Sequence, residues 1–282
     1  MKRIFKKLLF LITGNKYFQR KLQIVFKSVI ILMGIGTGAH PSQSGEIGVL
    51  KFLTKKSQSS NSKLVIFDVG TNKGQFLDLI ISNFVSNKYI VYCFEPASSV
   101  YSELIEKYQS KKNVVIENLG FDCLTGSSNL YYDFPGSLRT SKYKRNLRHL
   151  NIDFPYSEFA EFTTLDDYCR SKRIEKIDLL KLDVEGNEFN ILKGAKHLLK
   201  NRRIQLITFE FGRAQIDSKT FFKEIYYFLE SYHLKKLFRI LPNGYLYPVN
   251  KYDESCEIFF TTNYLAVMWR IIQHVPNQKE YQ

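Results

Sequence analysis

Short apolar runs alternate with amphipathic stretches along most of this chain from residue 64 onward. Five runs have the length of buried strands, namely 64–69, 90–95, 113–117, 177–183 and 204–210. Helical stretches separate most of them, and this alternation predicts a parallel sheet in an α/β fold. Two further segments, 235–241 and 245–249, flank Pro242-Asn-Gly244, which is typical of a turn, and we expect a last strand over 257–262.

The pattern before residue 64 predicts an extension followed by the start of the main domain. Residues 1–43 are basic and helix-prone, and they end in a turn cluster that contains Gly34, Gly36, Gly38 and Pro41. The main domain is expected over residues 44–270, with a helix that opens at Ser44-Gly-Glu46, and a tail over 271–282.

Length and cysteine content limit the architecture. With 282 residues and 44% apolar residues, the chain is long enough for one large α/β core and too short for two. The four cysteines are far apart and form no Cys-x-x-Cys pair. This pattern favours a reducing, cytoplasmic setting over a disulfide scaffold.

The formal charge of +14 admits several partners. Nucleic acid is not expected because the chain has no compact basic repeat or nucleic-acid motif. An anionic glycan or an anionic membrane face explains the charge equally well.

The start of the chain resembles a signal peptide, but its apolar run is short and lacks a small-residue cleavage site, so secretion is not expected. The later run 25–36 is broken by Lys27 and is shorter than the about 20 residues that span a bilayer. Lys2, Lys6 and Lys7 surround apolar residues in a predicted amphipathic helix. We expect this helix to pack against the core, with peripheral membrane contact as the alternative.

The first apolar run of the main domain ends in an acid and a glycine turn. Asp68 is followed by Gly70 and Gly74, and a helix is expected to start near Gln75. Backbone N–H groups at such a helix start favour polar or anionic ligands. The second run stops at Glu95, 27 residues after Asp68. An acid at this place holds ribose hydroxyls in dinucleotide-binding folds, so the pair predicts a nucleotide-cofactor pocket.

A third acidic segment follows the fourth expected strand, where Asp183, Glu185 and Glu188 stand at a strand exit. Five separated blocks together resemble the FkbM family of S-adenosylmethionine-dependent methyltransferases between about Ser44 and about Asn263. They are Asp68-Val-Gly-Thr-Asn-Lys-Gly74, Phe94-Glu-Pro96, Thr164-Leu-Asp-Asp-Tyr168, Asp183-Val-Glu-Gly-Asn-Glu188 and Thr208-Phe-Glu210.

The resemblance implies a class I methyltransferase fold, which is a Rossmann-like doubly wound sheet. Six strands are expected to be parallel, with an antiparallel last strand beside the fifth. The cofactor, S-adenosylmethionine, would contact residues at the matching positions, namely Asp68, Gly70, Asn72, Gly74, Glu95, Pro96, Asn118 and Asp122. Among them Glu95 would hold the ribose hydroxyls. Asp122 stands about one position earlier than the family's adenine-contacting aspartate.

Methyl transfer to an alcohol requires alignment and removal of the alcohol's proton. Asp183 is the expected base, and a divalent cation held by Asp183 with Glu185 or Glu210 is the alternative. Glu188 is expected to complement a helix N-terminus instead. Thr164 with Asp167 forms a predicted capping box, so Asp166 and Asp167 are left out of the active site.

An insertion at 126–162 separates the third and fourth strands, with short strand-like pieces at 129–132 and 159–163. Its middle carries a basic cluster, namely Arg139, Lys142, Lys144, Arg145, Arg148 and His149. The cluster either covers an anionic or hydroxyl-rich acceptor or forms a solvated loop.

The expected function is O-methylation of a sugar, glycan or other hydroxylated small molecule. One alternative is a non-catalytic glycan- or membrane-associated protein that keeps the fold. Another is a dinucleotide-dependent oxidoreductase, whose Gly-x-Gly-x-x-Gly spacing is missing because Asn72 stands at the second glycine position. The acceptor and the oligomeric state are left open.

Overall fold

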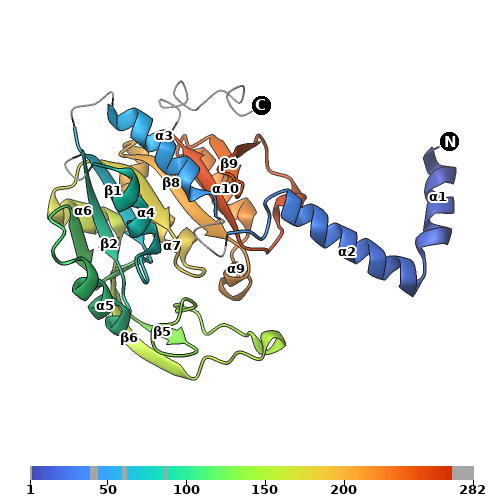
Figure 1. The fold of residues 1–282 in the computed structure, drawn as a ribbon, viewed down its shortest axis with the longest axis horizontal. Coiled ribbons are helices and arrows are strands. Elements are labelled where there is room, and N and C mark those ends of the chain that lie inside the picture. The colour runs from blue at the N-terminus through green and yellow to red at the C-terminus, as the bar shows by residue number, and fades with distance from the viewer. Residues whose placement is uncertain (1, 39–43, 59–61, 86–87, 269–282) are drawn as a thin grey trace.

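A computed structural model describes residues 2–38, 44–58, 62–85 and 88–268, and the predicted tail 271–282 lies outside them (Figure 1). Its main feature is an eight-stranded sheet with the order β10-β9-β11-β8-β7-β1-β2-β3. The strands are β1 (Leu64–Val69), β2 (Tyr89–Phe94), β3 (Val114–Glu117), β7 (Ile177–Leu182), β8 (Ile204–Phe211), β9 (Lys236–Ile240), β10 (Leu246–Val249) and β11 (Thr262–Val267).

Strand directions confirm the expected class I methyltransferase architecture. β3, β2, β1, β7 and β8 are parallel neighbours. β11 is antiparallel to both β8 and β9, so β9 runs in the same direction as the first five strands. β10 adds an antiparallel edge strand across the predicted turn. Every residue of β7 and β11 is buried, as is typical of strands that helices cover on both faces.

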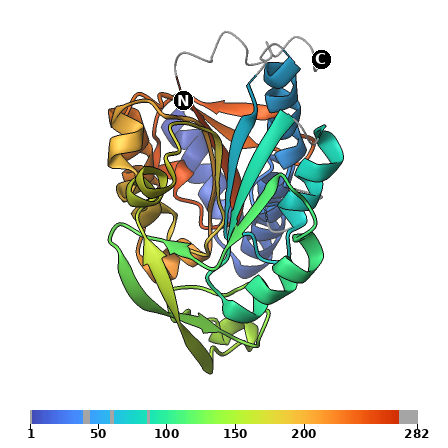
Figure 2. The same ribbon diagram turned by 90° about the vertical axis from the view of Figure 1, so that its left-hand side faces the viewer.

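Helices cover both faces of the sheet (Figure 2). They are α3 (Glu46–Gln58), α4 (Gln75–Asn83), α5 (Ser98–Tyr108), α6 (Leu165–Lys172), α7 (Glu188–Lys193), α8 (Lys196–Lys200), α9 (Ala214–Ser218) and α10 (Phe222–Ser231). α3 contacts α4, and α6 contacts α8. The crossovers thereby bury the apolar strands and leave the carboxyl ends of β1, β2, β7 and β8 at one edge.

The last strand begins later than we expected. The segment 257–262 is mostly loop, and β11 occupies Thr262–Val267. Glu257 explains the difference, because its carboxylate accepts the N–H groups of Phe222 and Lys223 at the start of α10, both at 2.9 Å. A residue that caps a neighbouring helix in this way lies outside the ladder.

The insertion, together with residues 120–121 before it, forms a second, smaller sheet that lies beside the carboxyl ends of the main strands (Figure 2). Its strands are β4 (Gly120–Phe121), β5 (Gly126–Tyr132) and β6 (Tyr156–Thr163), in the order β4-β6-β5. Both predicted strand pieces are present and are longer than expected. Between β5 and β6 the chain makes a 3₁₀ turn (Arg148–Leu150) and an isolated bridge between Tyr131 and Ser141.

The N-terminal extension forms α1 (Lys2–Thr13) and α2 (Lys16–Leu32), which project from the domain (Figure 1). The expectation that the first helix packs against the core is wrong, because Leu9, Phe10, Leu11 and Ile12 of α1 are exposed. In α2, Ile30 is the single buried side chain described. No helix in the described part of the chain is long and apolar enough to cross a bilayer.

Candidate functional site

A cavity of about 500 Å³ lies at the carboxyl edge of the sheet, between the strand ends and the insertion. This is where doubly wound sheets bind ligands, and the volume is in the range of small-molecule sites. Seven of the predicted site residues line it, namely Gly70, Asn72, Glu95, Pro96, Asp183, Glu185 and Glu210. Four others lie outside the lining, namely Asp68, Gly74, Asn118 and Asp122.

The glycine turn is held against the end of β7. Gly70 has a φ of +80°, and a Cβ atom there would lie 1.9 Å from the carbonyl oxygen of Asp183. The N–H group of Asp183 in turn donates to the carbonyl of Val69 at 3.0 Å. Only a glycine fits this approach, so the first motif and the acidic segment meet through their backbones.

Glu95 organises the other side of the turn. Its two carboxylate oxygens accept the N–H groups of Asn72 and Ala97, both at 2.9 Å. Asn72 adopts the left-handed conformation, with a φ of +47°. Burial raises the pKa of Glu95 to about 7, although these two backbone hydrogen bonds oppose the shift. Each oxygen keeps further acceptor capacity toward the cavity.

The predicted residues outside the lining support their neighbours. A Cβ atom at Gly74 would lie 2.5 Å from Oη of Tyr108. Asn118 donates from Nδ2 to the carbonyl oxygens of Glu95 at 2.9 Å and Pro96 at 3.1 Å. Asp122 forms an ion pair with Lys142. These contacts position the turn after β2 and the insertion.

Lys181 is a site residue that the sequence analysis missed. Its Nζ lies 3.0 Å from Asp183 and 3.6 Å from Asp68, and it lines the cavity. Burial lowers the pKa of Lys181, but the charges of Asp183, Asp68 and Glu46 outweigh it and raise that pKa above its ordinary value. The sequence feature that could have identified Lys181 is a lysine within the apolar run of β7, because an unpaired charge is costly in a buried strand.

Asp68 and Glu46 are buried acids that interact electrostatically with this lysine, and Glu46 also lines the cavity. Asp68 is fully buried, and neither of its carboxylate oxygens has a hydrogen-bond partner among the residues described. Burial raises the pKa of both acids, and Lys181 opposes the shift. Asp68 therefore acts on the cavity through Lys181 and not by direct contact.

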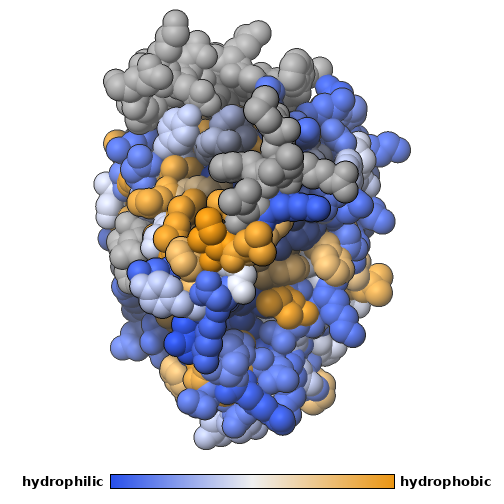
Figure 3. Space-filling model, turned by 90° about the vertical axis from the view of Figure 1, so that its right-hand side faces the viewer, coloured by the Kyte–Doolittle hydropathy of each residue, from blue (hydrophilic) through white to orange (hydrophobic). Residues whose placement is uncertain are grey.

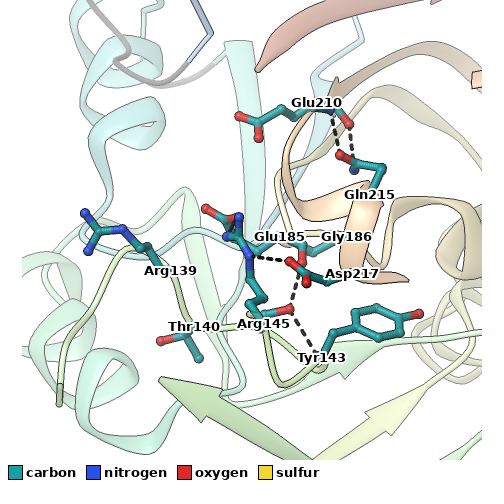
Figure 4. A network of polar contacts seen from close by, with 12 residues as sticks. Arg139, Thr140, Tyr143, Arg145, Glu185, Gly186, Glu210, Gln215 and Asp217 are labelled. Carbon is teal, nitrogen blue, oxygen red and sulfur yellow. Dashed lines mark hydrogen bonds and ion pairs between the residues drawn. The ribbon is translucent and has the colours of Figure 1, made fainter. Parts of the chain in front are cut away.

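Two glutamates, Glu185 and Glu210, also line the cavity, and Figure 4 shows their surroundings. Glu185 has a φ of +52° and forms an ion pair with Arg145. Burial raises the pKa of Glu185 to about 7, and Arg145 opposes the shift. The carboxyl group of Glu210 points away from Gln215 (Figure 4) and makes no hydrogen bond or ion pair within the described chain. Burial, and then the negative charges of Asp183 and Glu185, raise the pKa of Glu210 well above its usual range.

The acids that the sequence analysis left out of the active site bind backbone or side-chain donors of neighbouring elements. The carboxylate of Glu188 accepts the N–H groups of Val184 and Gly186, at 3.1 and 3.3 Å, and the side-chain amide of Gln215 at 2.6 Å. Thr164 accepts the N–H group of Asp167 at 3.0 Å as the N-cap of α6. Asp166 accepts two N–H groups at the start of α8.

The basic insertion divides into two groups. Arg139, Lys142 and Arg145 line the cavity. Arg145 is almost fully buried, and it joins the insertion to Glu185 and, at 3.4 Å, to Asp217 of α9 (Figure 4). The other members of the cluster, Lys144, Arg148 and His149, are exposed and lie outside the lining. Part of the cluster thus forms a wall of the cavity.

The Methyltransferase FkbM domain matches residues 68–237, which include all of the cavity lining except Gly38, Glu46 and Thr261. The chain belongs to the FkbM methyltransferase family. Two curated relatives are similar to it. The 2-O-methyltransferase NoeI of Sinorhizobium fredii is 27% identical over 154 residues, which are 49% of this chain and 60% of the relative. The hexuronic acid methyltransferase AglP of Haloferax volcanii is 25% identical over 168 residues, which are 60% of this chain and 64% of the relative.

The alignments therefore span less than two thirds of the length of these relatives. Among solved structures, the methyltransferase FkbM from Methylobacillus flagellatus is 14% identical, with a TM-score of 0.45, and the match covers 72% of this chain and 43% of that one.

Two further features of this FkbM domain bear on its chemistry. Arg213, which the sequence analysis also missed, lines the cavity, is exposed, and has no ion pair with any residue that the structure describes.

No group of three or more His, Cys, Asp or Glu side chains within the described ranges is arranged to hold a metal ion. The metal alternative for Asp183, Glu185 and Glu210 therefore gains no support.

Proposed function

We propose that this protein transfers the methyl group of S-adenosylmethionine to a hydroxyl group of a sugar or glycan. The observation that carries the proposal is that one cavity joins the glycine turn and Glu95 to Glu210, a half-buried carboxyl group with no hydrogen-bond or ion-pair partner among the described residues. Family membership supports methyl transfer, and the printed names of the two relatives, a 2-O-methyltransferase and a hexuronic acid methyltransferase, support a sugar acceptor.

The cofactor side of the cavity is assigned to Gly70, Asn72, Glu95 and Pro96. Free acceptor capacity on Glu95 suits the ribose hydroxyls, and the turn before α4 presents backbone to the methionine portion. Asp68 and Gly74 shape this side from behind, while Asn118 fixes the turn at Pro96. We assign Asp122 to positioning Lys142 and not to an adenine contact, because its carboxylate is occupied by that ion pair.

The catalytic side is assigned to the acids at the ends of β7 and β8. When bound, S-adenosylmethionine supplies an electrophilic methyl group, which the acceptor oxygen takes by in-line displacement while the sulfur keeps the bonding electrons. A base must accept the proton that the hydroxyl loses. Asp183 and Glu185 are ion-paired with Lys181 and Arg145, whereas Glu210 has no such partner in the described structure. We therefore assign the base to Glu210, with Asp183 as a positioning residue through Lys181.

The acceptor side is assigned to the insertion and to Arg213. Arg139 and Arg213 are cations on the lining; Arg213 is exposed, whereas Arg139 is half-buried and pairs with Asp133 at 2.9 Å. Guanidinium groups bind carboxylates in a bidentate manner. An acceptor that carries a carboxylate, such as a uronic acid unit, would match this wall. We therefore propose an acceptor that carries a negative charge.

The test combines calorimetry with a transfer assay. The full chain is titrated with S-adenosylmethionine, and it is then incubated with methyl-labelled cofactor and a panel of neutral and uronic acid oligosaccharides. Binding of the cofactor and label on a sugar oxygen, with higher transfer to the uronic acids, are expected. Absence of cofactor binding by the folded protein would remove the methyltransferase assignment, and equal transfer to neutral sugars would remove only the anionic acceptor.

A further inference from the structure

Helix α2 carries an apolar face that no part of the described domain covers. Seven apolar side chains recur at spacings of three, four and one, so they fall on one side of the helix. They are Phe18, Leu22, Val25, Phe26, Val29, Leu32 and Met33, and their exposed fractions range from 39% to 82%. Figure 3, viewed from the side on which α1 and α2 project, shows apolar side chains gathered in the middle of that side of the molecule.

The opposite side of α2 is basic. Lys16, Arg20 and Lys27 fall within one arc of the helix together with Gln23. The first 45 residues contain no Asp or Glu, although they contain eight of the chain's 41 Lys and Arg residues. The eight are Lys2, Arg3, Lys6, Lys7, Lys16, Arg20, Lys21 and Lys27.

We propose that α2, together with α1, docks this protein on the surface of an anionic lipid bilayer. A helix with an apolar face and a cationic face lies in the membrane interface, with the apolar side chains below the headgroups. Because no Asp or Glu offsets the positive charge of the first 45 residues, this charge complements anionic lipid. A second copy of the helix would cover the apolar face but leave the cations of the opposite face without anionic partners, whereas an anionic bilayer meets both.

The junction between α2 and the domain places the cavity next to this surface. The N–H group of Gly38 donates to the carbonyl oxygen of Thr261 at 3.0 Å, and that of Gly36 donates to Oγ1 of Thr262 at 3.1 Å. Gly38 and Thr261 both line the cavity. From Met33 to Gly38 the chain reaches about 17 Å at most, so a docked α2 keeps the cavity close to the headgroups.

The experiment is flotation of the full chain with two kinds of vesicle, pure phosphatidylcholine and phosphatidylcholine with phosphatidylglycerol. Binding to the anionic vesicles, and much weaker binding to the neutral ones, is expected. Val25→Glu places a charge on the apolar face and should lower the partition coefficient by about tenfold or more. Gln23→Glu is the matched control, since it adds the same charge to the basic face of the same helix and should cost about fivefold.

Neutralising Arg20 and Lys27 together with glutamine should lower binding to anionic vesicles by about 30-fold. Both sites are exposed, so the melting temperature and the cofactor affinity of every variant should match the parent. Absence of binding to anionic vesicles, or equal losses for Val25→Glu and Gln23→Glu, would overturn the proposal. A dimer in sedimentation that Val25→Glu abolishes, without vesicle binding, would assign the face to a second copy instead.

Discussion

Gly70 and Asp183 approach so closely that a Cβ atom on the glycine would lie 1.9 Å from the carbonyl oxygen of the aspartate. The two residues are 113 positions apart and belong to different motifs of the sequence. Their contact holds the ends of β1 and β7 together and brings the glycine turn next to the acidic segment that begins at Asp183. The turn is therefore as much a packing element as a ligand-binding one.

Gly70→Ala tests this relationship. The substitution combines a positive φ with a backbone collision, and we expect it to lower the free energy of unfolding by about 2–4 kcal/mol. Gly136→Ala is the matched control, because Gly136 has a φ of +79° but the nearest atom to its added Cβ is 3.9 Å away. In Gly136→Ala the positive φ is strained but no steric clash is added, so the free energy of unfolding should fall by about 1 kcal/mol. Urea unfolding measures both, and equal losses would contradict the role of the close approach.

Lys181→Met should destabilise the fold by about 3–5 kcal/mol at pH 7, because it leaves buried acids without their cation. Burial already raises the pKa of Asp68 and Glu46 above the unfolded values. An acid with a raised pKa in the folded state destabilises that state increasingly as the pH rises from the unfolded pKa to the folded pKa, and fully above it.

The loss of unfolding free energy that Lys181→Met causes should consequently become smaller when the pH falls from 7 toward 5, because these acids become protonated. Adding Asp68→Asn to Lys181→Met should restore part of the stability at pH 7. Urea unfolding of parent, single and double variants at the two pH values measures this. A deficit that stays constant with pH would show that the lost contacts are not electrostatic.

Affinity for S-adenosylmethionine should fall below pH 7 because the pKa of Glu95 lies at about 7. Protonation removes acceptor capacity toward the ribose hydroxyls, and the loss should approach tenfold per pH unit. Glu95→Gln should bind about 10- to 100-fold more weakly at pH 8 and lose this part of the pH dependence. Calorimetry from pH 5.5 to 8.5 measures both proteins, and identical slopes would exclude Glu95 as the titrating group.

Glu210→Gln should lower kcat by about 10²- to 10⁴-fold and leave cofactor affinity unchanged, since the amide cannot accept the acceptor's proton. Asp183→Asn disturbs the ion pair with Lys181 and should have a smaller effect on kcat. In the parent, kcat should rise with pH because the base must be deprotonated and its pKa is raised. A full loss of kcat in Asp183→Asn together with an active Glu210→Gln would move the base to Asp183.

Arg145→Met should raise the acceptor KM by about 10-fold and leave cofactor affinity unchanged. The arginine joins the insertion to Glu185 and Asp217, so its loss should free this wall of the cavity and leave two acids unpaired. Arg148→Met is the control, because Arg148 is exposed and lies outside the cavity lining. Steady-state kinetics with a sugar acceptor measures both variants, and an unchanged KM in Arg145→Met would separate the insertion from acceptor binding.

The strands of the sheet were the most predictable part of the fold. β1, β2, β7 and β8 lie within a residue of their predicted limits, because strands buried on both faces appear as continuous apolar runs. The last strand was misplaced, since the contact of Glu257 with α10 is made across 35 residues of sequence. The predicted packing of α1 against the core was wrong for a related reason, because an amphipathic pattern indicates an apolar partner without identifying it.

The sequence by itself determined the fold class, the glycine turn, the position of Glu95 and the family, because each depends on local backbone needs and on motifs in a set order. Only the tertiary structure decided which charges meet. It pairs Asp183 with Lys181 and Glu185 with Arg145, leaves Glu210 without a partner among the described residues, and buries Asp68 behind the cavity. Ion pairs join residues that are distant in sequence, and burial shifts a pKa according to all the elements that surround the group. Neither quantity is encoded in a local pattern.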